Sequence, residues 1–135
     1  MANRAERQCN SNPGELAMAR FSDEQVESFR ARLEQLRTEA NERLRKSSES
    51  ARPVDLGESI GRLTRVDAMQ GQQMARTQRL RDEGQLQLIR AALARLEAGT
   101  YGQCMKCEEE IEAQRLEIAP ESTQCMTCRR ASDTR

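Results

Sequence analysis

Two pairs of cysteines near the C-terminal end constrain this chain more than any other feature. They read Cys104-Met-Lys-Cys107 and Cys125-Met-Thr-Cys128, which is a C-x2-C-x17-C-x2-C pattern. Two short chelating turns joined by a loop of about 15–20 residues are typical of zinc sites with four thiolate ligands. Because four thiolates leave no open coordination position, we predict that these cysteines hold one structural zinc ion.

Other interpretations of the cysteines have less support. A pair of exchanging dithiols would need the βαβ context of a thioredoxin-like fold, and the sequence shows no such pattern. The fifth cysteine, Cys9, lies far from the two pairs, and we interpret it as a free thiol with no assigned role. One local feature is unusual, because Glu108 follows Cys107 where a glycine often relieves the tight turn.

The charge pattern limits the partners of this finger. The chain has 22 basic and 22 acidic residues, so no global field attracts nucleic acid. From Glu97 to Cys128 there are seven acidic residues and two basic ones, Lys106 and Arg115. Phosphate contacts need Lys and Arg. We therefore expect no sequence-specific DNA binding by the finger itself.

An amphipathic helix is predicted over residues 23–49. Ser22 to Gln25 form a capping box, with a hydroxyl at the N-cap and Gln three residues later. Apolar residues then recur every three or four positions, at Val26, Phe29, Leu33, Leu36, Ala40 and Leu44. One such narrow stripe is not stable alone, so this helix needs a partner.

The partner is a second, longer helix from about Glu58 to Ala98, after Pro53 and Gly57 interrupt the pattern. A weaker, partly polar stripe comes first, with Leu63, Val66, Gln70, Met74, Thr77 and Leu80. After a phase shift at Gly84 a stronger stripe follows, with Leu86, Ile89, Leu93 and Leu96. Gly99 fits the left-handed position that ends a helix.

We therefore predict a mainly α protein, in which a long antiparallel helical hairpin (a coiled coil) carries a small C-terminal four-cysteine zinc finger. The expected segments are a flexible arm over 1–21, a hairpin over 22–98 with its turn near 50–58, the finger over 99–130 and a tail over 131–135. Only 36% of the residues are hydrophobic and 2% aromatic, which suits solvated helices better than a thick core.

No segment of the sequence points to a membrane. Apolar runs stay far below the roughly 20 residues that span a bilayer. The first twenty residues are polar and contain Pro13 and Gly14, so they lack the apolar core of a signal peptide. We expect a cytoplasmic protein, in which paired cysteines bind metal rather than form disulfides.

Several motifs around the cysteines resemble those of the DksA/TraR zinc-finger family. The stretch Ala92 to Cys104 ends in a Gly-x-Tyr-Gly-x-Cys lead-in, and Arg115-Leu-Glu-x-x-Pro120 precedes the second cysteine pair. The resemblance is specific over about 92–128. Upstream, residues 61–70 (GRLTRVDAMQ) look like a segment of smaller or divergent members.

This resemblance implies a function. Members of the family bind bacterial RNA polymerase by inserting a helical hairpin into its secondary channel. They alter initiation at particular promoters, some of them together with guanosine tetraphosphate in the stringent response. The expected partners are therefore bacterial RNA polymerase and, at the complex, guanosine tetraphosphate, with this chain acting as a monomer.

The resemblance also points to the hairpin tip. The best-known members carry two aspartates three apart, with an alanine two residues further on. Here Asp55 and Glu58 keep the acidic spacing, and Ile60 replaces the alanine, while Asp67 and Ala68 form a second candidate. Capping of a first helical turn also explains Asp55 and Glu58, and a solvated helix face also explains Asp67.

Two other classes of protein stay open. A nucleic-acid-binding zinc protein could use the arginines around the turn, which are Arg43, Arg45, Arg52, Arg62 and Arg65. Its binding would fall steeply with salt. A coiled-coil interaction module, or a homodimer, would show concentration-dependent stability if it self-associates. An enzyme is not expected, because the chain has no histidine and the metal site is closed.

Overall fold

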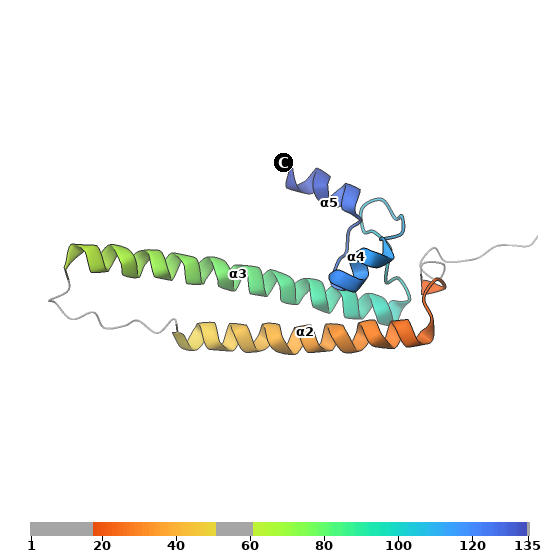
Figure 1. Cartoon of the computed structure of the whole chain (residues 1–135), viewed down its shortest axis with the longest axis horizontal. Helices are drawn as coiled ribbons and strands as arrows, with labels where there is room; N and C mark the ends of the chain where they lie inside the picture. Colours follow the sequence, from red (N-terminus) through yellow and green to blue (C-terminus); the bar gives the residue numbers. More distant parts are fainter. Residues whose placement is uncertain (1–17, 51–60, 135) are drawn as a thin grey trace, which may run out of the picture.

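A computed structural model describes residues 18–50 and 61–134, and within these residues the protein is mainly helical. The helices in chain order are α2 (Asp23–Ser50), α3 (Arg62–Ala98), α4 (Ala113–Ile118) and α5 (Met126–Asp133). Figure 1 shows α2 and α3 running antiparallel side by side, with α4 and α5 gathered near one end of the pair. The predicted mainly α hairpin with a C-terminal cysteine-rich finger is confirmed.

The capping box that the sequence predicted starts α2. The Gln25 amide donates to the Ser22 hydroxyl at 3.2 Å, and the Ser22 amide donates to the Gln25 side-chain oxygen at 3.0 Å. The two bonds satisfy donors that a helix start leaves without intrahelical partners. Along the helix, the predicted stripe is buried or half-buried, and Leu33 and Ala40 are fully covered.

The second long helix, α3, is unbroken over its 37 residues. It starts at Arg62 rather than near Glu58, because Gly61 has an extended backbone with φ −59° and ψ 155°. It ends as predicted, since Gly99 adopts a left-handed conformation with φ 75°. The amide of Thr100 then donates to the carbonyl of Arg95 at 2.9 Å, which closes the last turn.

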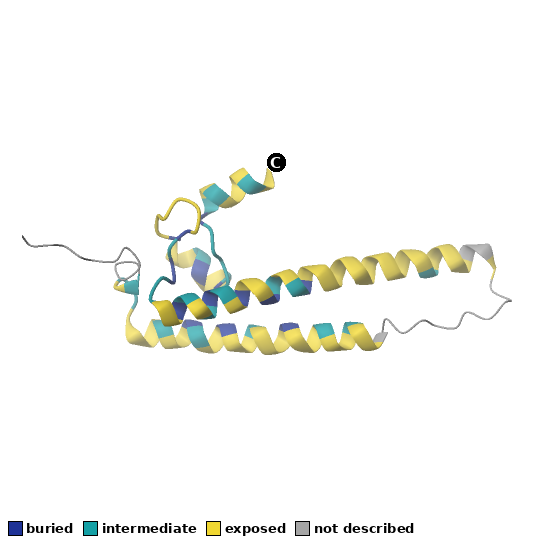
Figure 2. Cartoon of the chain, turned by 180° about the vertical axis from the view of Figure 1, so that it is seen from behind, coloured by how far each residue is buried: buried dark blue, intermediate teal, exposed yellow. Residues whose placement is uncertain are grey.

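One hydrophobic core joins the hairpin to the finger. The second half of α3 supplies four buried residues, Leu86, Ile89, Ala92 and Leu96. The finger adds Tyr101, Ile111 and Leu116 to the same cluster, each at most 1% exposed. Figure 2 shows that the buried residues concentrate where the finger meets the two long helices.

A polar contact sets the register of α2 against α3. The Arg43 guanidinium donates to the Asp82 carboxylate at 3.1 Å and to the Gln85 side-chain oxygen at 2.9 Å. Counting seven residues forward from Arg43 and seven back from Asp82 places Ser50 level with Ala75. Residues 62–74 therefore project past the described end of α2 by roughly 20 Å at 1.5 Å per residue. This overhang is visible in Figure 1.

The members of the weaker α3 stripe whose side chains the structure describes are exposed to solvent. Val66, Met74 and Leu80 are 49%, 74% and 61% exposed. Gln70 and Thr77 are also exposed. Two causes act together, because part of this stripe lies beyond α2 and because the phase shift turns it to a different face from the Leu86–Leu96 stripe.

Some predicted features lie outside the described residues. These are the hairpin turn near 50–58, Arg52 in that turn, Cys9 and most of the expected N-terminal arm. Residues 18–21 are described, and Met18 and Phe21 pack against the core. At the other end α5 continues to Asp133, past the predicted finger boundary at residue 130. Among the described helices there is none with the length and apolar character needed to cross a membrane.

Candidate metal centre

The four cysteine sulfurs converge at one point of the finger. The Sγ atoms of Cys104, Cys107, Cys125 and Cys128 all lie within 4.8 Å of one another. Those of Cys107 and Cys125 are 3.7 Å apart. Tetrahedral zinc with Zn–S bonds of about 2.3 Å needs sulfurs about 3.8 Å apart. The donor set is all sulfur and already close to that spacing, so these residues suit one zinc ion.

Backbone amides shape the first pair of cysteines into a tight turn. The Lys106 amide donates to the Cys104 sulfur at 3.5 Å, and the Cys104 amide donates to the Glu109 carbonyl at 2.8 Å. Glu108 takes a φ of 60°, which makes it the one non-glycine with positive φ in the part of the chain that the structure describes. This left-handed position is the reason that glycine often follows such a turn.

The second pair lies at the start of α5. Cys125 is the N-cap residue of this helix, and its sulfur accepts a bond from the Cys128 amide at 3.5 Å. A thiolate at a helix N-terminus is favoured by the partial positive charge there. The loop that brings the two pairs together is fixed by a bond from the Met105 amide to the Thr123 carbonyl at 2.9 Å.

The pKa values of two of these cysteines shift in opposite directions, for different reasons. Burial raises the pKa of Cys104, but the amides of Cys107, Cys125 and Lys106 outweigh burial and lower this pKa to about 6. Bonding to the Cys125 and Cys107 sulfurs raises the pKa of Cys128 to about 12. Four neighbouring thiolates repel one another, and a bound dication would relieve that repulsion while releasing the remaining protons.

Three aromatic rings attach the finger to the hairpin. Phe29 of α2 lies 5.4 Å from Tyr101, and Phe21 lies 5.4 Å from Phe29, measured between ring centroids. The Tyr101 hydroxyl donates to the Pro120 carbonyl at 2.8 Å inside the finger. Burial raises the pKa of Tyr101, so this hydroxyl stays protonated and keeps its bond. The metal centre is therefore held on a rigid base.

Arg20 adds a second attachment. Its guanidinium donates to the carbonyls of Gly102 at 2.9 Å and Ile111 at 2.6 Å, and it also pairs with Glu110 at 3.2 Å. The same group lies 4.5 Å from the centre of the Phe21 ring, in cation–π geometry. Arg20, just before α2, thus binds both sides of the loop that carries the first cysteine pair.

Two more arginines support the loops inside the finger. Arg95, on the last turn of α3, donates to the carbonyls of Thr100 and Gln103. Arg115, on α4, donates to the Gln124 carbonyl at 3.1 Å, just before the second cysteine pair. Each connects a helix to the segment that leads into a cysteine pair. Neither was singled out from the sequence as a site residue, because both act on carbonyls that carry no sequence signal.

The outer surface of the finger is acidic, as the sequence indicated. Glu108, Glu109, Glu110 and Glu112 are all exposed. Lys106 donates to the Ser132 hydroxyl of α5 at 2.5 Å. This surface would repel nucleic acid phosphates rather than attract them.

The structure places the tip candidates only in part. Asp67 is exposed and Ala68 half-buried, both in the overhang of α3. Asp55 and Glu58 lie outside the described residues, as does the side chain of Arg62. Asp67 therefore lies on the hairpin far from the finger, at the end where the connection between the two long helices must run.

The sequence and the fold both have known counterparts. Residues 99–133 match the model of the prokaryotic dksA/traR C4-type zinc finger, and the four cysteines lie within this matched segment. The structure is similar to that of the transcription factor DksA2 from Pseudomonas aeruginosa, with a TM-score of 0.66 at 24% identity. That similarity covers 89% of this chain and 95% of the other, and it concerns the fold. No curated protein matches the sequence.

Proposed function

We propose that this chain is a DksA-type transcription factor that binds bacterial RNA polymerase through its helical hairpin, with zinc in a purely structural role. The C4-type finger at 99–133 and the fold shared with DksA2, which is described as a transcription factor, support this proposal. The closed set of four thiolates supports a structural ion, because it offers no position for a substrate. The protein acts in the cytoplasm, where the polymerase is found, and is not an enzyme.

The observation that carries the proposal is the shape of the hairpin. About 20 Å of α3 projects past α2, while the finger packs at the opposite end of the pair. A narrow helical projection on a rigid base is suited to entering a channel of another protein. The finger and its aromatic contacts then fix the direction in which the projection points.

The charges of the hairpin favour a protein partner over nucleic acid. Of the arginines considered for phosphate binding, Arg43 pairs with Asp82 at 3.1 Å and Arg45 pairs with Glu49 at 2.7 Å. These two guanidinium groups are already engaged. Arg65 is exposed, but the outer surface of the finger is acidic, which disfavours contact with a phosphate backbone.

We propose that the acidic tip comprises Asp55, Glu58 and Asp67, with Ala68 beside Asp67. Asp67 lies on the overhang and is exposed to solvent. Asp55 and Glu58 belong to the connection that joins the two long helices at the same end. Guanosine tetraphosphate, where it takes part, binds at the complex rather than to this chain alone.

Binding of the zinc-loaded protein to bacterial core RNA polymerase tests the function. We expect binding that a known secondary-channel factor displaces. A variant with Asp55→Asn, Glu58→Gln and Asp67→Asn should still bind but lose its effect on initiation. The matched control changes three exposed acids outside the tip and outside the cysteine turns, Glu34→Gln, Glu112→Gln and Glu117→Gln, and should keep both. No detectable binding by the folded, zinc-loaded protein would reject the proposal.

A further inference from the structure

The overhang of α3 and the residues just after it, up to Thr77, carry a face with no partner in the described part of the chain. We call it the methionine–glutamine face. At about 100° per residue its members fall within an arc of about 140° on one side of the helix. All of its residues are exposed, and they are Val66, Met69, Gln70, Gln73, Met74 and Thr77. Met69 and Met74 are the most accessible of its apolar side chains, at 64% and 74%.

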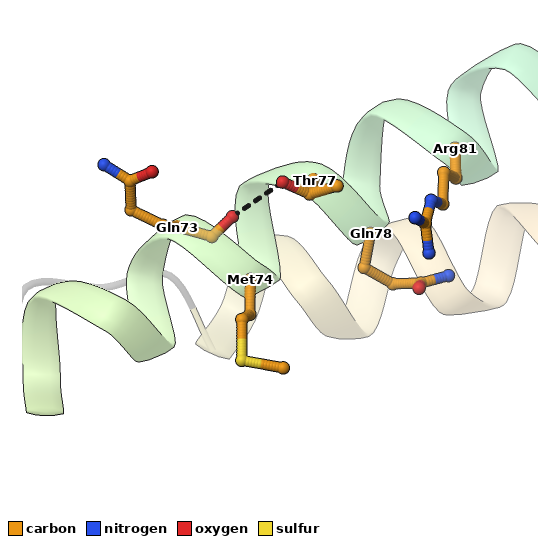
Figure 3. Close-up of a pocket in the computed structure, with 5 residues that line it drawn as sticks. All are labelled: Gln73, Met74, Thr77, Gln78 and Arg81. Atoms are coloured by element: carbon orange, nitrogen blue, oxygen red, sulfur yellow. Dashed lines mark hydrogen bonds between the residues drawn. The ribbon is translucent and has the colours of Figure 1, made fainter.

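Two shallow, open depressions lie along the methionine–glutamine face. A shallow depression of about 390 Å³ is lined by Met69, Gln70, Gln73 and Met74. A second one of about 300 Å³ adjoins it and is lined by residues up to Arg81. Figure 3 shows the Met74 side chain extending from α3 at this second depression, with Gln73 and Thr77 on the same helix. Flexible methionine side chains beside such depressions can adapt to an incoming apolar group.

This stretch of helix is also uncharged. Residues 68–75 read Ala-Met-Gln-Gly-Gln-Gln-Met-Ala, eight positions without a charge in a chain of which 33% is charged. Depletion of charge together with exposed methionine is characteristic of the centre of a protein interface. The stretch is therefore better suited to contact with a protein than to permanent exposure to water.

The order of the residues along this segment indicates that the face fits a second copy of α3. The segment reads nearly the same in both directions about a midpoint between Gly71 and Gln72. In an antiparallel pair of α3 helices centred there, Met69 lies level with the partner's Met74. Gln70 lies level with the partner's Gln73, and Val66 with the partner's Thr77. Methionine thus meets methionine and amide meets amide, and no like charges are opposed within the face.

We propose that two copies of this chain pair antiparallel, through a two-fold axis at the methionine–glutamine face. A closed dimer uses the same surface patch on both subunits, so a face that is symmetric in sequence is complementary to itself. The methionines exclude water from the contact, while the glutamine amides can donate and accept across it. No charge has to be desolvated, because the face itself has none.

The dimer would hide part of the active surface. If the proposed function holds, the overhang that enters the polymerase is the same overhang that the second copy covers. Self-association and polymerase binding then exclude each other, and the dimer is a stored, inactive form. The pairing itself rests only on the features of α3, so it does not depend on the polymerase.

Sedimentation equilibrium of the zinc-loaded full chain tests the pairing, without polymerase present. Six side chains of one helix bury much less than the about 1,600 Å² of a standard interface. We therefore expect a dissociation constant in the micromolar to millimolar range. The variant Met69→Glu/Met74→Glu should weaken the dimer at least about tenfold through like-charge repulsion. The control Gln72→Glu/Ala75→Glu adds the same charge to exposed positions on the other side of the helix and should change the dissociation constant less than about threefold.

Methionine methyl resonances locate the contact in the same samples. Signals of Met69 and Met74 should shift as the concentration rises, while that of Met105, which is exposed on the finger, should stay in place. A protein that stays monomeric up to about 1 mM would overturn the proposal. So would a dimer that the two double variants weaken equally, or one that leaves the Met69 and Met74 signals unmoved. Helix content by circular dichroism confirms that each variant is folded.

Discussion

At the scale of single residues, Gly102 lies in close contact with the segment before α2. Its φ of 87° lies in the left-handed region. A Cβ atom there would lie 2.7 Å from the Arg20 guanidinium and 2.9 Å from the Phe21 ring. Both conditions require glycine, because the backbone would be strained and the space is already filled.

We expect Gly102→Ala to lower the free energy of unfolding by about 2 kcal/mol, from backbone strain plus displacement of Arg20 and Phe21. Urea unfolding of the zinc-loaded protein measures it. Gly71→Ala is the control, since Gly71 is inside α3 and a Cβ there meets nothing within 4 Å. That change should stabilise the helix by up to about 1 kcal/mol. Equal stability of the Gly102 variant and the wild type would contradict the close approach.

The sequence predicted some residue roles well and others not at all. The four cysteines, the Ser22 cap and the Gly99 cap depend on neighbours within a few positions or on a known ligand spacing. Arg20 was placed in a flexible arm, yet it donates to the carbonyls of Gly102 and Ile111. Those bonds join positions more than 80 residues apart. Every residue has a backbone carbonyl, so the residue types do not indicate which carbonyls accept these bonds.

At the scale of helices, a buried charge sets the register of the mostly apolar contact between α2 and α3. The Asp82 side chain is 6% exposed, and it accepts from Arg43 and, more weakly, from Gln78 at 3.4 Å. If the two helices shifted against each other, the Asp82 carboxylate would be buried without its cation, so few other registers are stable. The pair thereby specifies the register, and with it the length of the overhang.

Removing one member of this pair should cost more than removing both. Arg43→Met leaves the buried Asp82 carboxylate without its cation, and we expect a loss of about 2 kcal/mol, since Arg43 itself is 43% exposed. The double variant Arg43→Met/Asp82→Leu should recover most of that loss. Chemical unfolding of the wild type, of the single variants Arg43→Met and Asp82→Leu, and of the double variant gives the coupling energy. Additive effects of the two single changes, with no recovery, would show that the pair does not interact.

Apolar periodicity predicted which helices exist and about how long they are. It did not predict which face of each helix is buried. The stronger stripe of α3, from Leu86 to Leu96, packs as the periodicity predicted. The weaker stripe, which includes Val66 and Leu80, is exposed. A period identifies a face that is suited to burial, but whether a partner reaches that face depends on the relative lengths and register of α2 and α3.

At the scale of the whole molecule, the metal centre and the hairpin share one core. Tyr101 and Ile111 of the finger belong to the same buried cluster as Phe29 and Leu33 of α2. Metal binding and hairpin stability are therefore coupled, because ordering the finger also orders one end of the coiled coil.

Removal of zinc should lower the stability of the hairpin as well as that of the finger. We expect a chelator to reduce helix content and to lower the melting temperature by at least about 10 °C, since several buried finger residues lose their positions. Circular dichroism during heating measures both changes. Added zinc should restore them in the wild type but not in Cys104→Ser/Cys125→Ser. Unchanged melting after complete metal removal would show that the finger and hairpin fold independently.

The length of α3 has a mechanical consequence. Its 37 residues extend about 55 Å from the finger to the far end. A tilt of about 5° at the base would move that far end by about 5 Å, which is the length of one helical turn. The aromatic and arginine contacts between the finger and the hairpin therefore determine where the far end of α3 lies relative to the finger. A small rotation of the finger against the hairpin therefore produces a large displacement of the far end of α3.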